Sequence, residues 1–226
     1  CLLSRGLGDV YKRQALYVHG LACLAVLKEL LPALNPVAAA GLSLGEFTAH
    51  AAAGTYSFEE GLRLVQKRGA FMEEACNATK GTMAAMIGGS DENVIKLAQE
   101  CDVDVANFNC PGQTVVSGTE EGVDKAIAGA KGAGCKIAKK LNVAGAYHSR
   151  LMHSAMVKLA EELKNVSFGT PSMPVYCNYE ARVVEGPDDI RSMLEHQVCG
   201  SVRWTASMQK LVDQGHRLFI ELGPGK

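Results

Sequence analysis

The sequence lacks the features that mark membrane-spanning and nucleic-acid-binding proteins. It has no uninterrupted apolar run of membrane-spanning length, because Lys28 breaks the longest candidate, Leu21–Leu31. It also has no basic excess, and a formal net charge of −1 leaves nothing to neutralise phosphates. We therefore expect a soluble protein with no membrane and no nucleic-acid partner.

Paired cysteines are missing too. The chain has eight cysteines but no C-x-x-C pair, so their spacing fits neither a zinc site nor a small disulfide framework. We interpret them as free thiols in a reducing compartment, which predicts a cytoplasmic location. What the chain does have is 47% hydrophobic residues over 226 positions, enough to build the core of one large or two small domains.

Both ends of the sequence are unusual. Residues 1–13 show no helical or alternating pattern and no initiating methionine, and we interpret them as a non-native, adapter-like segment. The last residues, Gly223-Pro224-Gly225-Lys226, are typical of a turn rather than a terminus. We therefore expect a fragment of a longer chain.

The most informative stretch is Gly41-Leu42-Ser43-Leu44-Gly45, a Gly-x-Ser-x-Gly pattern. It follows a predicted strand at 37–40 and precedes a predicted helix that begins near Leu44. This order is typical of a nucleophile elbow, in which both glycines avoid a collision between a Cβ and the neighbouring backbone. Ser43 would then project its hydroxyl, and the N–H of Leu44 could face an oxyanion. A plain Gly/Ser turn at a helix start has the same pattern, so context must decide.

The next helix carries a charge on its apolar face. Ser57 and Glu60 have capping-box spacing and open a helix predicted over 58–75. At helical spacing Arg68 falls on the apolar half of this helix. A buried guanidinium stays charged and needs an anion or water at the end of its reach. A structural ion pair or a snorkelling side chain is one interpretation, and capture of a substrate carboxylate is the other.

Residues 81–141 alternate between strand and helix patterns. Strands are predicted over 82–87, 103–108, 114–117 and 136–141, and helices over 91–101 and 119–133. The order βαββαβ is that of a ferredoxin-like unit.

The remainder of the chain predicts helices around a mostly parallel sheet. His148 lies in a loop just before a helix predicted from Ser149 to Leu163. A lone histidine in a loop is commonly structural unless a nucleophile lies nearby. Further on, we expect strands over 174–178 and 218–222, the second one buried, a helix capped by Asp188 or Asp189 that runs to Val198, and a helix over 202–213.

Several motifs occur in the order seen in one family. They are Gly41–Phe47, Arg68–Met72, Asn107–Gly118, Gly145–Ser149, Gln197 with Val202-Arg203-Trp204, and Glu221–Gly225. From Gln14 to Lys226 the chain resembles the malonyl-CoA:acyl carrier protein transacylases and the acyltransferase domains of fatty-acid and polyketide synthases. The resemblance implies an α/β fold with a hydrolase-like, mostly parallel sheet flanked by helices. Residues 14–80 and 142–226 would form this large, incomplete subdomain, and 81–141 the inserted ferredoxin-like small subdomain.

The same resemblance implies the roles of the site residues. Ser43 is expected to be the acylated nucleophile, His148 its general base, and Leu44 N–H an oxyanion donor. On the substrate-binding side, the backbone carbonyl of Gln197 would orient the imidazole and Arg68 would pair with the free carboxylate of a malonyl group. Met72 and Asn107 would line the cleft between the subdomains.

The sequence departs from the family at both ends. The family's N-terminal strand, its Gly-Gln-Gly loop with the second oxyanion donor, and its C-terminal helix have no counterpart here. Loss of one oxyanion donor costs on the order of 3 kcal/mol of transition-state stabilisation. We therefore expect this chain to be poorly active, and the longer protein to be an acyltransferase.

The implied reaction moves a malonyl group from coenzyme A to the phosphopantetheine thiol of acyl carrier protein, in fatty-acid biosynthesis, with no metal or redox cofactor. Two alternatives stay open. An α/β-hydrolase esterase or thioesterase orders its triad Ser…Asp/Glu…His, usually with the histidine near the C-terminal end, and has no obvious use for Arg68. A non-catalytic docking domain could keep the fold without the chemistry.

Overall fold

The computed structural model describes residues 4–224 and the side chains from residue 10 onward. The elements in chain order are α1 (Ser4–Leu30), β1 (Ala39–Ala40), α2 (Leu44–Ala52), α3 (Phe58–Ala78), β2 (Gly81–Ile87), α4 (Asp91–Glu100), β3 (Asp104–Cys110), β4 (Gln113–Thr119), α5 (Glu120–Gly129), β5 (Ile137–Lys140), the 3₁₀ turn η1 (Arg150–Met152), α6 (His153–Lys164), β6 (Val175–Tyr176), α7 (Pro187–His196) and α8 (Trp204–Asp213). No helix among these described residues is both long and apolar enough to cross a membrane.

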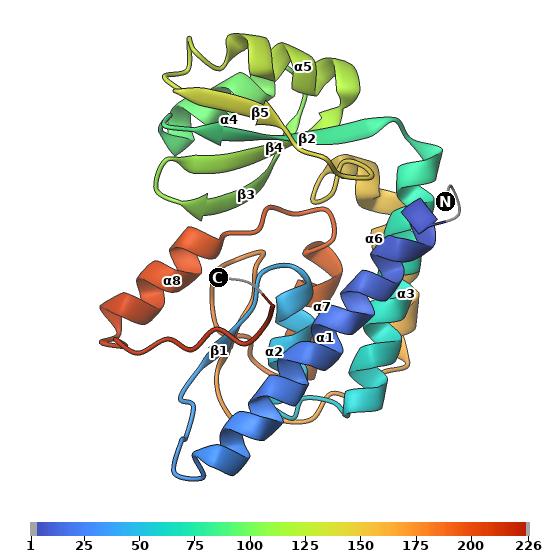
Figure 1. Cartoon of the computed structure of the whole chain (residues 1–226). Coiled ribbons are helices and arrows are strands. Elements are labelled where there is room, and N and C mark those ends of the chain that lie inside the picture. The colour runs from blue at the N-terminus through green and yellow to red at the C-terminus, as the bar shows by residue number, and fades with distance from the viewer. Residues whose placement is uncertain (1–3, 225–226) are drawn as a thin grey trace.

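The small subdomain, residues 81–141, has the predicted βαββαβ order (Figure 1). Its sheet is antiparallel throughout, with strand order β3-β4-β2-β5, which is the ferredoxin-like arrangement. Apolar side chains of α4 and α5 pack together against one face, on Ala84, Met86 and Val116. The other face presents Met83 and Val115 to the loop before His148.

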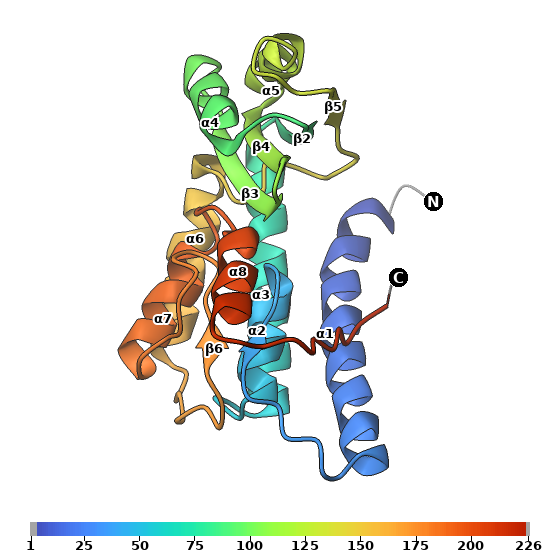
Figure 2. The same cartoon turned by 90° about the vertical axis from the view of Figure 1, so that its left-hand side faces the viewer.

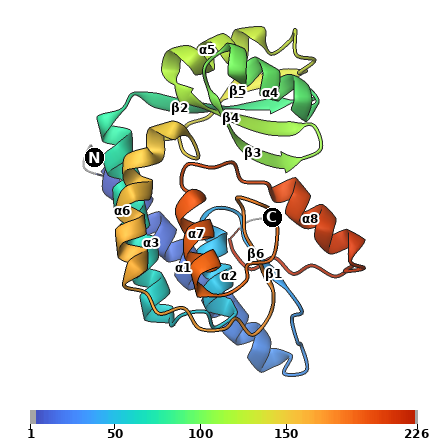
Figure 3. The same cartoon turned by 180° about the vertical axis from the view of Figure 1, so that it is seen from behind.

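The large subdomain is a group of helices around a very short parallel sheet. β1 pairs with β6 over two residues each. Helix α3 lies between α1 on one side and α6 on the other (Figures 2 and 3). The core between these elements is built from side chains such as Phe47, Leu64, Leu159 and Ile190, all fully buried. The fold class is the α/β arrangement expected, and among the described residues the parallel sheet of the large subdomain consists of this one strand pair.

Three local predictions are wrong. The segment 218–222 is no buried strand: it is irregular, and Leu218 is 79% exposed, because no described strand lies beside it to satisfy its backbone. Helix α7 is not capped by Asp188 or Asp189, since its N-cap is Gly186 with Pro187 in the first turn. Helix α1 begins at Ser4, although residues 1–13 show no helical pattern in the sequence, and no proline interrupts this segment. The adapter-like origin of residues 1–13 stays a prediction.

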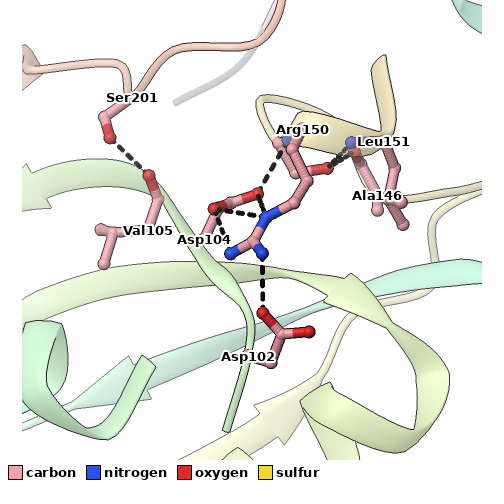
Figure 4. A network of polar contacts seen from close by, with 8 residues as sticks. Asp102, Asp104, Val105, Ala146, Arg150, Leu151 and Ser201 are labelled. Carbon is pink, nitrogen blue, oxygen red and sulfur yellow. Dashed lines mark hydrogen bonds and ion pairs between the residues drawn. The ribbon is translucent and has the colours of Figure 1, made fainter. Parts of the chain in front are cut away.

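The two subdomains meet along the edge strand β3. The backbone of Val202 donates to Ala106 O (2.8 Å) and accepts from Phe108 N (2.9 Å), so the segment after α7 extends the sheet edge. Nearby, Arg150 binds Asp104 through its backbone N–H and its guanidinium, and also reaches Asp102 (Figure 4). Val202 and Arg150 lie a few positions after Gln197 and His148, two polar residues of the site described next.

Candidate active site

The chain turns sharply between β1 and α2. At Ser43 the backbone adopts φ 54° and ψ −101°, and α2 begins at the next residue. A Cβ on Gly41 would lie 2.0 Å from the carbonyl atoms of Gly45, so only glycine fits at residue 41. The matching prediction for Gly45 is wrong, because a Cβ there would meet nothing within 4 Å. This turn has the backbone geometry of a nucleophile elbow, with the serine at a positive, strained φ.

His148 lies against the hydroxyl of Ser43 although 105 positions separate them. Its Nε2 is 2.8 Å from Ser43 Oγ, and its Nδ1 is 2.8 Å from the backbone oxygen of Gln197. A carbonyl oxygen can only accept, so Nδ1 carries the proton and Nε2 is free to accept from the serine hydroxyl. The ring is therefore oriented to remove the Ser43 proton.

Burial keeps this imidazole neutral. His148 is 4% exposed, and burial, followed by the nearby positive charge of Arg68, lowers its pKa to about 4, while the Gln197 carbonyl opposes the shift. Both main causes penalise the charged ring. At neutral pH His148 is thus in the form that can act as a base.

Arg68 reaches the same hydroxyl from α3. Its Nη2 donates to Ser43 Oγ and to Gln197 Oε1, both at 2.9 Å, and its guanidinium lies 5.3 Å from the ring centre of Phe47. The side chain is 2% exposed, which excludes snorkelling, and no described carboxylate forms an ion pair with it. Burial, and then repulsion from Arg13, lowers its pKa. A buried cation without its own anion favours an anionic ligand at this position.

Two residues that the sequence did not single out complete the site. Asn178 accepts from Ser43 N–H (2.6 Å) and donates to Gly41 O (2.7 Å). These two hydrogen bonds fix the backbone of the elbow on both sides of Leu42. The carboxylate of Glu46 accepts from the side chain of Gln197 (2.7 Å) and from Asn178 N–H (3.0 Å). Glu46 could have been noticed as a carboxylate on the inner face of α2, but nothing local marks Asn178 beyond its place after a strand.

Two predicted cleft residues are buried. Met72, one helical turn after Arg68, packs into the core of the large subdomain, and Asn107 lies in β3 beside Val202. Contact of either side chain with a substrate stays a prediction. Leu44 is the first residue of α2, so its N–H has no acceptor within the helix and can serve an oxyanion beside Ser43.

This arrangement combines an alcohol, a neutral imidazole and a free helix N–H, which together support acyl transfer through serine. Residues 14–225 match the model of the family described as acyl transferase domain. The chain belongs to the acyl transferase domain family.

This acyl transferase domain is similar to several proteins named malonyl CoA-acyl carrier protein transacylase. It is 41% identical over 217 residues to the malonyl CoA-acyl carrier protein transacylase of Bacillus subtilis, covering 94% of this chain and 68% of that protein. It is 40% identical over 195 residues to the Escherichia coli K12 protein of the same name, covering 84% of this chain and 63% of that one. The chain thus spans about two thirds of the length of these relatives.

Solved structures of similar proteins agree with the fold. An acyl carrier protein S-malonyltransferase from Vibrio cholerae is 34% identical with a TM-score of 0.93, covering 96% of this domain and 72% of that chain. A malonyl-transacylase in complex with a type II polyketide synthase acyl carrier protein is 35% identical with a TM-score of 0.92, covering 96% and 71%.

Proposed function

We propose that this domain moves a malonyl group from coenzyme A to the phosphopantetheine thiol of acyl carrier protein, through an acyl group on Ser43, in fatty-acid biosynthesis. The observation that carries the proposal is the shared hydroxyl. Ser43 Oγ lies 2.8 Å from His148 Nε2 and 2.9 Å from Arg68 Nη2, so base and buried cation meet at one atom. A base beside a serine supports acylation, and the added cation supports an acyl group that itself bears a carboxylate.

The proposed chemistry runs in two matched halves. In the first, His148 Nε2 takes the Ser43 proton while Oγ attacks the thioester carbon, and Leu44 N–H binds the oxyanion. The carbon–sulfur bond then breaks, and the coenzyme A thiol leaves with the proton held by His148. In the second half, the phosphopantetheine thiol attacks the acyl-serine by the reverse route and Ser43 regains its proton.

Arg68 has the substrate-selecting role in this proposal. Its guanidinium can donate two N–H groups to the malonyl carboxylate. That carboxylate would be the ion-pair partner that Arg68 lacks among the described residues. Acyl exchange between thiol and alcohol changes no oxidation state, so the proposal includes no redox cofactor and gives no step to a metal. Cytoplasmic location is also proposed, on the ground that unpaired thiols such as the buried Cys135 and Cys177 suit a reducing compartment.

The first test is acylation of Ser43 itself. The chain is incubated with malonyl-CoA, digested, and the peptide containing Ser43 is weighed by mass spectrometry. We expect a malonyl adduct on Ser43 in the wild type and none in Ser43→Ala, because the adduct needs the hydroxyl. Absence of the adduct from the wild type would favour a non-catalytic docking domain.

A further inference from the structure

Glu46 is a buried carboxylate with an unusual set of neighbours. It is 0% exposed and lies in the first turn of α2, three positions after Ser43. Both of its hydrogen bonds, from Asn178 N–H and from Gln197 Nε2, end on Oε2, and Oε1 has no hydrogen-bond partner among the described residues. Burying a carboxylate that has no ion-pair partner among the described residues is costly, and the charge of Arg68 offsets that cost only in part, so its place in the site needs a reason.

The side-chain amide of Gln197, which donates to Glu46, explains why a carboxylate is buried here. An amide can point its oxygen either way, and only its partners decide which way it points. Here Nε2 faces two atoms that can only accept, Glu46 Oε2 at 2.7 Å and the backbone oxygen of Ser43 at 2.9 Å. The amide oxygen therefore points the other way, toward Arg68.

The orientation of this amide matters for Arg68. Gln197 Oε1 accepts from Arg68 Nη2 at 2.9 Å, the same nitrogen that donates to Ser43 Oγ. A reversed amide would set its NH₂ group against the guanidinium, donor against donor, and push the cation off the hydroxyl.

We propose that Glu46 is a positioning residue for acyl-group selection: by fixing the Gln197 amide, it aims Arg68 at the acyl group on Ser43 and sets the preference for acyl chains that end in a carboxylate. The inference rests on the proposed function. It assigns to Glu46 no contact with substrate, and the proposed effect on the malonyl-to-acetyl ratio passes through Gln197.

The acceptor, rather than the charge, is the part of Glu46 that this role uses. Burial raises the pKa of Glu46 to about 7, with the hydrogen bonds and Arg68 opposing the shift. A proton would settle on the unpartnered Oε1 and leave Oε2 able to accept both hydrogen bonds. Glu46→Gln can keep the same acceptor, which makes it the matched control for Glu46→Leu, where the acceptor is lost.

The experiment measures kcat/KM for acylation of Ser43 by malonyl-CoA and by acetyl-CoA. For Glu46→Leu we expect the malonyl-to-acetyl ratio to fall about tenfold, the loss typical of one hydrogen bond to a charged group. For Glu46→Gln we expect the ratio to stay within about threefold of wild type, because the acceptor remains. A merely structural role would lower both substrates equally, and an unchanged ratio in Glu46→Leu would overturn the inference.

A double-mutant cycle tests the route through Gln197. Gln197→Met removes the amide at similar length and should itself lower the ratio about tenfold. In that background Glu46→Leu should change the ratio no further, since coupled residues are not additive. Independent, additive losses would overturn the inference, and so would an intact ratio in Gln197→Met, which can be read even if Glu46→Leu fails to fold. Malonylation of the wild type is checked first, so failure of the proposed function is seen separately.

Discussion

At the scale of single residues, the hydroxyl of Ser43 forms hydrogen bonds with two side chains, as donor to one and acceptor from the other. His148 accepts from it, and Arg68 donates to it. Both partners are buried, and Arg68 raises the cost of charge on His148: it is the second cause, after burial, of the lowered pKa of His148. An anionic acyl group at Arg68 would relieve that repulsion.

Arg68→Ala removes the buried cation. We expect kcat/KM for malonyl-CoA to fall about tenfold to a hundredfold, the range for hydrogen bonds to charged groups, and acetyl-CoA to be affected less. Arg63→Ala is the control, because Arg63 lies on the same helix but forms only surface ion pairs, with Glu60 and Glu162. An unchanged malonyl-to-acetyl preference in Arg68→Ala would remove Arg68 from the selecting role.

The lowered pKa of His148 predicts an unusual pH profile. Since its folded pKa is about 4 rather than the ordinary 6.5, acylation of Ser43 should keep its base until the pH approaches 4. Over the same window the unfolded chain binds the extra proton, so His148 makes the fold less stable as pH falls from 6.5 toward 4. Single-turnover malonylation across pH, with circular dichroism to confirm folding, measures this. An acid limb centred at 6.5 would contradict it.

At the scale of elements, the caps and the elbow show what local sequence can predict. Ser57 accepts from the N–H group three residues ahead, as expected, and Ser90 does the same, because an N-cap depends only on its own turn. The cap of α7 depends on which of several nearby groups Asp189 binds, and a strand at 218–222 would need a neighbouring strand from elsewhere in the chain. Asp189, for example, binds Arg182 and Glu185 N–H instead of starting the helix.

The two glycines of the elbow, Gly41 and Gly45, allow a prediction in which one substitution is the control for the other. Gly41→Ala puts a Cβ 2.0 Å from Gly45 and should destabilise the fold by about 3 kcal/mol and abolish acylation. Gly45→Ala meets open space and should stabilise α2 by up to about 1 kcal/mol. Thermal unfolding and Ser43 acylation measure both. Equal tolerance of the two substitutions would mean that the turn is looser than described.

At the scale of the whole molecule, the fold brings together residues from four separate segments. Ser43 lies on the elbow, Arg68 on α3, His148 after the small subdomain, and Gln197 after α7. The βαββαβ order and the elbow could be predicted from sequence because each depends on local periodicity and turn residues. The links through Glu46 and Asn178 could not, because they join atoms more than 130 positions apart, through hydrogen bonds that no local pattern encodes.

The complete transfer reaction depends on this assembled site. The chain malonylated on Ser43 is freed of excess malonyl-CoA and mixed with phosphopantetheinylated acyl carrier protein, and all malonyl groups are followed by mass spectrometry to completion. We expect the malonyl group to leave Ser43 and appear on the carrier thiol, even if the turnover is slow. Free malonate with an unloaded carrier would instead identify a thioesterase and contradict acyl transfer.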